Sequence, residues 1–167
     1  MKRWFLLFCC ISASLFAYQG GPSHLMVGLG VFNVDRHSEK SVLWQIEYRW
    51  EVYCHHLRPL VSLFVTTDGG LFACGGLAYD IFLCKKLVFT PSFAPGFYYQ
   101  GHGRNLGFPI NFRSALELAF DFKEKGRFGA QFNHISNAHM FYRNPGVNSL
   151  FIFYAIPFSQ KKKASGK

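Results

Sequence analysis

Residues 44–52 have the sequence WQIEYRWEV, in which large apolar side chains alternate with polar ones. Successive side chains of a β-strand point to opposite faces, so this period of two predicts a strand with one apolar and one polar face. The apolar face carries Trp44, Ile46, Tyr48, Trp50 and Val52, and the polar face carries Gln45, Glu47, Arg49 and Glu51. The apolar face is costly to expose to water, whereas a face with both signs of charge suits an enclosed network. A transmembrane β-barrel satisfies both, with the apolar face in lipid and the polar face in the lumen.

The same alternation recurs along the chain and predicts eight strands. Seven further strands are expected at residues 25–34, 61–67, 71–83, 87–95, 112–122, 127–136 and 148–158. Polar or glycine-rich segments separate them, among them a turn at 55–60 that contains Pro59 and a long loop at 96–109. The connections after the second, fourth and sixth strands are short and most others are longer, as in outer-membrane barrels whose termini lie in the periplasm. We therefore expect an all-β fold, an eight-stranded antiparallel transmembrane β-barrel over residues 18–158.

A soluble eight-stranded barrel of the lipocalin type would show the same period with its apolar faces turned inward around a ligand. Periodicity alone does not say which face is inside. The mixed charges of the polar face favour the membrane barrel, and so does the cysteine content. After residues 1–17 only Cys54, Cys74 and Cys84 remain, an odd number without metal-ligand spacing. We expect them to be core or lipid-facing side chains rather than a complete disulfide framework.

The two ends of the chain carry much of its net charge of +9. In residues 1–17, Lys2 and Arg3 precede an apolar run and a small-residue region, as in an export signal peptide. The run is short for the alternative, a membrane anchor. Residues 159–167 form a basic tail that we expect to be disordered. The body is only mildly basic and has no nucleic-acid-binding motif, so its charge favours anionic lipid head groups over a nucleic-acid partner.

A polar cluster stands out at the end of the strand predicted at 127–136. The apolar face of that strand ends in His134 and Ser136. If this face meets lipid, both side chains lie at the level of the outer-leaflet head groups, because the strand runs outward. Residues two apart on a strand have Cα atoms about 7 Å apart on one face. An imidazole and a hydroxymethyl group can close that gap, although most lone histidines are polar residues that merely flank a loop.

This pair has the chemistry of a nucleophile and its base. His134 could take the proton from Ser136, whose oxygen would then attack an ester carbonyl. The Asn137 amide, side chain or backbone, is the nearest candidate to stabilise the oxyanion that results. The sequence therefore predicts a carboxylic ester hydrolase with a Ser–His site.

The cluster resembles the motif of the outer-membrane lipid A 3-O-deacylases, the PagL family. The resemblance rests on His134-x-Ser136-Asn137-Ala138, on the Asn-Pro-Gly turn at 144–146 and on the eight-strand pattern. It implies a barrel in the cell outer membrane that removes the 3-position acyl chain, a 3-hydroxy fatty acid, from lipid A of lipopolysaccharide. It also implies outer-membrane lipids as partners and no metal or organic cofactor. Residue by residue, it implies Ser136 as nucleophile, His134 as general base and Asn137 as an oxyanion-hole contributor.

The chain departs from this family at the third member of the site. The best-studied family pattern has a Glu fourteen residues after the His, and that position here is Asn148. An Asn carbonyl can still accept the imidazole N–H and fix its tautomer, but it lacks the charge that stabilises an imidazolium. We therefore expect slower hydrolysis than in a Glu-bearing relative.

Two classes of function follow from these features. The first is a lipid A esterase. The second is a non-enzymatic or catalytically weakened outer-membrane barrel with a lipid-binding or structural role, which the missing carboxylate favours. The sequence leaves open whether the barrel forms a homodimer. Three basic loop residues, His139, Arg143 and Arg104, are expected to be solvated rather than to bind lipid phosphates.

Overall fold

The computed structural model describes residues 21–36, 39–53, 55–122 and 126–158. The signal peptide expected at 1–17, the tail expected at 159–167 and Cys54 lie outside the described residues. Across the described ranges, no helix is both long enough and apolar enough to span a membrane.

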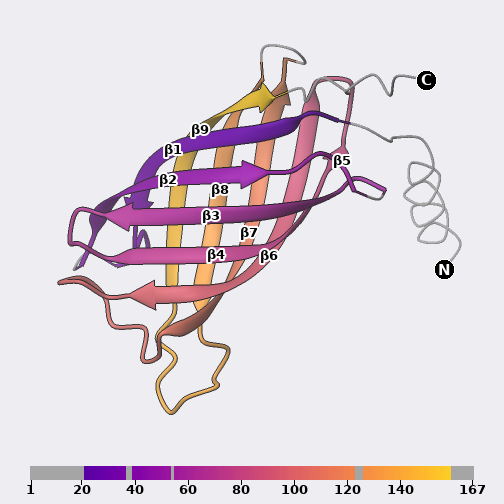
Figure 1. Cartoon of the computed structure of the whole chain (residues 1–167). Coiled ribbons are helices and arrows are strands. Elements are labelled where there is room, and N and C mark those ends of the chain that lie inside the picture. Colours follow the sequence, from indigo (N-terminus) through magenta and orange to yellow (C-terminus); the bar gives the residue numbers. More distant parts are fainter. Residues whose placement is uncertain (1–20, 37–38, 54, 123–125, 159–167) are drawn as a thin grey trace, which may run out of the picture.

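The chain forms a single antiparallel sheet closed into a barrel (Figure 1). Its strands are β1 (Ser23–Phe32), β2 (Ser41–Arg49), β3 (Leu57–Thr66), β4 (Leu71–Tyr79), β5 (Ile81–Phe82), β6 (Leu87–Tyr99), β7 (Ile110–Asp121), β8 (Arg127–Ser136) and β9 (Val147–Phe158). Apart from β4 and β5, strands that are neighbours in sequence pair with one another; β1 also pairs with β9, and β4 with β6. The short β5 continues β4 after Asp80 and pairs with the same strand, β6, so the two occupy one place in the wall. The predicted eight-stranded antiparallel barrel is confirmed.

The two ends of the barrel differ in their connections. Segments 33–40, 67–70, 100–109 and 137–146 connect strands at one end, which we call the loop end. The other end, the turn end, has connections 50–56, 83–86 and 122–126 (Figure 1). The first and last described residues lie beside the turn end, as the sequence predicts for a barrel with both termini on one side.

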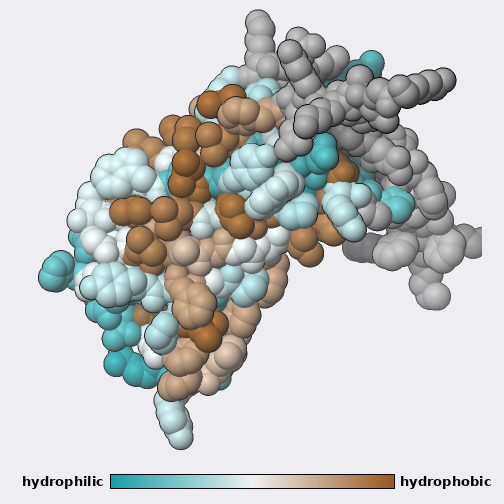
Figure 2. Space-filling model, in the orientation of Figure 1, coloured by the Kyte–Doolittle hydropathy of each residue, from teal (hydrophilic) through white to brown (hydrophobic). Residues whose placement is uncertain are grey.

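The outer face of the barrel is apolar. Trp44 is 49% exposed and Ile46 is 46% exposed, whereas the intervening Glu47 is only 1% exposed. The faces are therefore assigned as the alternation predicts, with the apolar face outside, and the lipocalin-type alternative is wrong. Figure 2 shows apolar side chains gathered across the middle of the visible wall and hydrophilic ones at the loop end. An apolar band of this kind around a closed barrel is the surface that lipid requires.

Charged side chains inside the barrel form two networks. In the first, the Glu47 carboxylate accepts from Arg49 Nε and from Arg113 Nη1, both at 2.6 Å, and Arg49 also donates to Glu117. In the second, Asp80 Oδ2 accepts from Arg58 Nε and Arg127 Nη1, both at 2.8 Å. Each buried carboxylate thus has a guanidinium partner, as buried charge requires.

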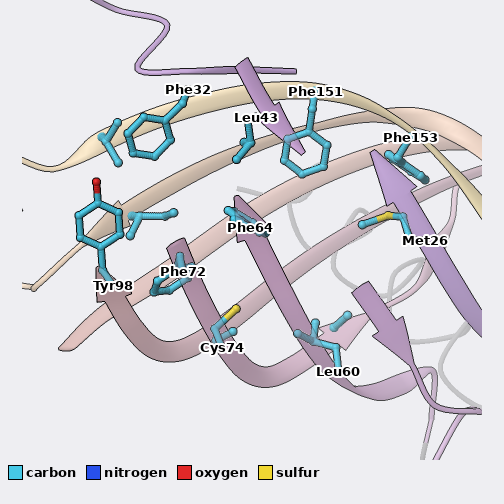
Figure 3. Packing of buried hydrophobic residues seen from close by; sticks show 14 of the residues in the cluster. Met26, Phe32, Leu43, Leu60, Phe64, Phe72, Cys74, Tyr98, Phe151 and Phe153 are labelled. Atoms are coloured by element: carbon cyan, nitrogen blue, oxygen red, sulfur yellow. The ribbon is translucent and has the colours of Figure 1, made fainter. Parts of the chain in front are cut away.

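An apolar cluster fills the rest of the interior. Side chains from different strands of the wall, including Phe64, Phe72 and Phe151, point toward one another across the lumen (Figure 3). Ile135 of β8 and Val147 of β9 belong to this cluster and are 0% and 2% exposed. They pair in register, so the ends of β8 and β9 are anchored from the inside.

Several predicted boundaries differ from those of the structure. Strand β2 ends at Arg49, not at residue 52. Glu51 is exposed, and the chain reverses further on, at the left-handed φ angles of His55 (43°) and His56 (74°). The turn predicted at 55–60 ends at His56, and Pro59 lies within β3. A proline near the start of a strand is tolerated, and its carbonyl accepts from Trp50 N–H at 3.0 Å. Strand β6 extends to Tyr99, so the loop predicted from 96 begins at 100.

Candidate active site

The alternation of side chains along β8 places His134 and Ser136 on the outer face, at the loop end of the strand. The residues between and before them, Ile135 and Asn133, point into the barrel and are fully buried. His134 is exposed and Ser136 is half-buried. Because Ile135 is held by the apolar cluster, the backbone that carries both side chains is fixed from behind.

The neighbouring strands complete a polar row across the outer face. Ser114 of β7 and Asn148 of β9 lie directly opposite His134 on either side. His134 Nδ1 and Asn148 Oδ1 are 2.7 Å apart, a short hydrogen bond. The predicted pairing of His134 with Asn148 is therefore present in the structure.

Ser136 and His134 make no hydrogen bond to each other in the described chain. Ser136 instead lies beside Phe112 of β7, its partner in register. In unliganded enzymes such bonds are often long and form only when substrate binds. The two side chains lie on the same face and at the strand end that the sequence predicts, but they are not hydrogen-bonded to each other.

Asp35 extends the polar row beyond Asn148. Asn148 Nδ2 donates to Asp35 Oδ2 at 2.8 Å. The contact arises because Val34 N–H donates to the Asn148 carbonyl at 3.0 Å, just past the end of β1, and Asn33 turns the chain there with a φ of 62°. Sequence reasoning missed Asp35, which is 113 residues from its partner. It also missed Ser114 as a neighbour, although alternation alone assigns Ser114 to the outer face.

Asn137 is fully buried and joins two loops. Its Nδ2 donates to the carbonyls of Leu106 (2.9 Å) and Arg143 (2.7 Å), and its backbone N–H donates to Asn144 Oδ1 at 3.0 Å. All of its N–H groups are thus engaged within the loop end. The residue predicted as an oxyanion donor folds the loop that follows Ser136, with Ala138 and His139 held at left-handed φ angles of 53° and 58°.

Gly146 packs against the imidazole of His134. Its φ is 58°, and a Cβ at this position would lie 3.1 Å from His134 Cε1. The backbone conformation therefore favours glycine here, and an added Cβ would press against the ring. The Asn-Pro-Gly turn noted in the sequence thus serves the site directly.

Arg104 connects three loops beneath the site. It is 7% exposed and donates through Nε to the Gly146 carbonyl and through Nη1 to Glu39, both at 2.9 Å. The expectation of a solvated loop residue is wrong for Arg104, because its guanidinium is used inside the protein. His139 and Arg143 are exposed, as expected.

The polar row lies on an open wall. An apolar hollow of about 840 Å³ lies elsewhere on the barrel, lined by residues that include Ile46, Leu63, Pro95 and Phe97, and it contains none of the predicted site residues. Among the described residues, no cluster of three or more His, Cys, Asp or Glu side chains could hold a metal ion.

Comparison with known proteins agrees with the barrel fold. A family model described as lipid A 3-O-deacylase (PagL) matches residues 24–157. The crystal structure of the outer membrane enzyme PagL is similar, with a TM-score of 0.66 and 16% identity over 81% of this chain and 99% of that one. A de novo designed transmembrane β-barrel has a TM-score of 0.56 and 9% identity over 83% of this chain and 98% of the design. The Yersinia pestis outer membrane protein Ail in a phospholipid nanodisc has a TM-score of 0.50 and 12% identity, covering 81% and 99% of the two chains. No curated protein sequence is significantly similar to the chain.

Proposed function

The chain belongs to the lipid A 3-O-deacylase (PagL) family, a family of ester hydrolases, and on this premise we propose that Ser136, His134 and Asn148 form its hydrolytic site. The observation that carries the proposal is the 2.7 Å contact between His134 Nδ1 and Asn148 Oδ1 on the outer face. An amide oxygen only accepts hydrogen bonds. With Asn148 in this orientation the proton lies on Nδ1, so Nε2 keeps the lone pair that a general base needs.

The reaction begins when a lipid A molecule in the outer leaflet brings its 3-position ester to Ser136. The serine Oγ attacks the ester carbonyl carbon while His134 Nε2 takes the hydroxyl proton. The tetrahedral intermediate then collapses, the bond to the sugar oxygen breaks, and His134 returns the proton to that oxygen. The products are the 3-hydroxyl of the sugar and an acyl ester on Ser136.

Water completes the turnover. His134 removes a proton from water, the hydroxide attacks the acyl carbon, and Ser136 leaves with the proton from His134. The fatty acid is released and the side chains return to their starting state. The chemistry needs only a nucleophile, a base and oxyanion stabilisation, so all three functions can come from this chain.

Asn137 contributes to the oxyanion hole through the loop that it folds. Its own N–H groups bind Leu106, Arg143 and Asn144. The backbone N–H groups of Ala138 and His139 make no hydrogen bond within the described chain, and successive N–H groups in a turn can form an anion-binding concavity. These donors lie two and three residues after Ser136 and support the role assigned to Asn137.

Mass spectrometry of lipid A tests the proposal. Cells that express the wild-type chain should contain lipid A lighter by one 3-hydroxyacyl chain, and cells that express Ser136→Ala should not. Ser114→Ala is the matched control. Ser114 of β7 lies directly opposite His134 of β8, and its hydroxyl should be dispensable. If Ser114→Ala abolished the lighter lipid A and Ser136→Ala did not, the nucleophile would be Ser114 and the proposal would be wrong.

The missing His134–Ser136 bond favours the second candidate, a non-enzymatic or weakened lipid-binding barrel. In that case lipid A would have the same mass with the wild-type chain, with Ser136→Ala and without the protein. Equal folding of the two proteins, seen as heat-modifiable mobility on a gel, must accompany that comparison.

A further inference from the structure

We propose that Asp35 is a positioning residue of this site, which orients the Asn148 amide and thereby fixes the tautomer of His134; the inference rests on the hydrolytic site proposed above. The position beside His134 has an amide instead of a carboxylate, and an amide can bind a histidine through either of its two ends. Asp35 contacts the far end of that amide at 2.8 Å. The site thus has a carboxylate after all, which contacts His134 through Asn148 and not directly.

The chemistry of the two Asn148 contacts allows one arrangement. An ionised carboxylate can only accept, so the Asn148 group that faces Asp35 must be Nδ2. Asn148 Oδ1 then faces His134 Nδ1 at 2.7 Å, and Nδ1 must carry the proton. The basic nitrogen is therefore Nε2. A carboxylate at position 35 decides in this way which nitrogen of the imidazole can act as a base.

Without Asp35, the amide loses this selection. Rotation of Asn148 by half a turn would direct Nδ2 at His134, where it would donate to Nδ1 and place the imidazole proton on Nε2. That tautomer cannot accept the proton of Ser136. The rate should fall with the fraction of molecules in the wrong tautomer, whereas substrate binding, which does not use Nε2, should change little.

The fold holds Asp35 where this contact requires it. Val34 N–H bonds to the backbone of Asn148 itself, so residue 35 follows directly beside the Asn148 side chain. The left-handed turn at Asn33 is held by its Nδ2, which donates to the Glu39 carbonyl at 3.3 Å. Glu39 in turn accepts from the buried Arg104. The connection that carries Asp35 is thus attached to the same loops that carry the site.

Kinetics of the purified full-length barrel in mixed lipid A–detergent micelles provide the first test. Asp35→Ala should lower kcat at least about twofold, the loss expected once both amide orientations are equally populated, with KM nearly unchanged. Asp35→Asn keeps an oxygen that can accept from Asn148 and should fall between Asp35→Ala and the wild type. Asp68→Asn removes a carboxylate from the 67–70 connection at the same end and should have no effect.

A double variant separates positioning from support of the fold. In Asn148→Glu, a carboxylate accepts directly from His134 Nδ1 and no amide needs to be oriented. Adding Asp35→Ala to Asn148→Glu should therefore leave kcat unchanged or raise it. An equal fall in kcat in both backgrounds would overturn the proposal, because it would show that Asp35 merely holds the loop.

The tautomer can be observed without any activity. With ¹⁵N-labelled histidine, the wild-type spectrum should show the Nδ1-protonated form for His134, identified by the signals that His134→Gln removes. Asp35→Ala should add the Nε2-protonated form. Unchanged spectra and unchanged kcat in Asp35→Ala would overturn the role of Asp35. An inactive wild type whose His134 still changes tautomer in Asp35→Ala would instead reject the proposed hydrolysis and keep the positioning.

Discussion

The interior ion-pair networks and the polar row on the outer face both consist of hydrogen-bonded polar side chains, but these are connected differently. Inside, Glu47 accepts from Arg49 and Gln45 of its own strand and from Arg113 of β7, so this carboxylate has three partners. Outside, His134 contacts Asn148, and Asn148 contacts Asp35, one hydrogen bond at each step. The interior networks are buried, whereas the outer contacts are exposed.

Because of this difference, we expect the interior networks to determine the stability of the barrel and the outer row to determine turnover. Buried charges strongly affect the free energy of unfolding, because removing one leaves its partner desolvated. Exposed polar contacts contribute little to that free energy. In a row of single hydrogen bonds, however, loss of any one bond removes the influence of Asp35 on His134. Substitutions inside the barrel should therefore change folding, and substitutions in the outer row should change turnover.

The largest expected effect is on turnover. His134→Ala removes the proposed general base and should reduce kcat about 10⁴-fold, the size of effect seen when a member of a serine-hydrolase triad is lost. The free energy of unfolding should change by less than about 0.5 kcal/mol, as for other surface substitutions. Single-turnover assays and urea unfolding in detergent measure the two quantities. A variant that keeps a tenth of the activity would assign the base elsewhere.

The next effect is on stability. Glu47→Gln removes the charge that compensates Arg49 and Arg113, and should lower the free energy of unfolding by about 3–5 kcal/mol. Activity per folded molecule should stay within about twofold of the wild type. Urea unfolding followed by tryptophan fluorescence measures the loss. Glu51→Gln is the matched control, because Glu51 is exposed beyond the end of β2 and should be neutral.

A smaller effect on turnover is expected from Asn148→Ala, which removes the acceptor for His134 Nδ1 and with it the contact to Asp35. We expect kcat to fall about 100-fold, the upper end of the range for such outer partners. Barrel stability should be unchanged. If Asn148→Ala and Asp35→Ala each lower kcat but the double variant is no worse than Asn148→Ala, the two residues act in one chain; additive losses would contradict this.

The smallest expected effect is a change in both turnover and stability. Gly146→Ala strains a backbone at φ 58° and presses a methyl group against His134 Cε1, so we expect about a tenfold fall in kcat and a stability loss of about 1 kcal/mol. Gly69→Ala separates the two causes, because Gly69 has a φ of 74° with nothing within 4 Å of its added Cβ. It should show the same stability loss and full activity. Equal activity in the two variants would remove the role of Gly146 beside the ring.

Alternation was sufficient to predict the wall of the barrel. A period of two assigns Trp44 and Ile46 to one face and Glu47 to the other, and the same period put His134 and Ser136 on one face of β8. These assignments depend only on the covalent geometry of a strand, so they transfer directly from sequence to structure.

The rest depended on register and on loop conformation. Asp35 reaches Asn148 because β1 and β9 close the barrel and because Asn33 adopts a left-handed turn, neither of which has a local signal. The burial of Arg104 and the engagement of every Asn137 N–H group likewise follow from how three loops meet. Contacts between distant loops were therefore the part that the sequence could not predict.

The outward direction of His134 has a consequence for how the enzyme encounters its substrate. A side chain on the outer wall meets lipid in the plane of the leaflet, so substrate arrives by lateral diffusion and never leaves the membrane. The turnover rate should then depend on the mole fraction of lipid A among the leaflet lipids, not on its concentration in bulk solution. Neighbouring lipids would act as the diluent, and membrane composition would set the working activity of the protein.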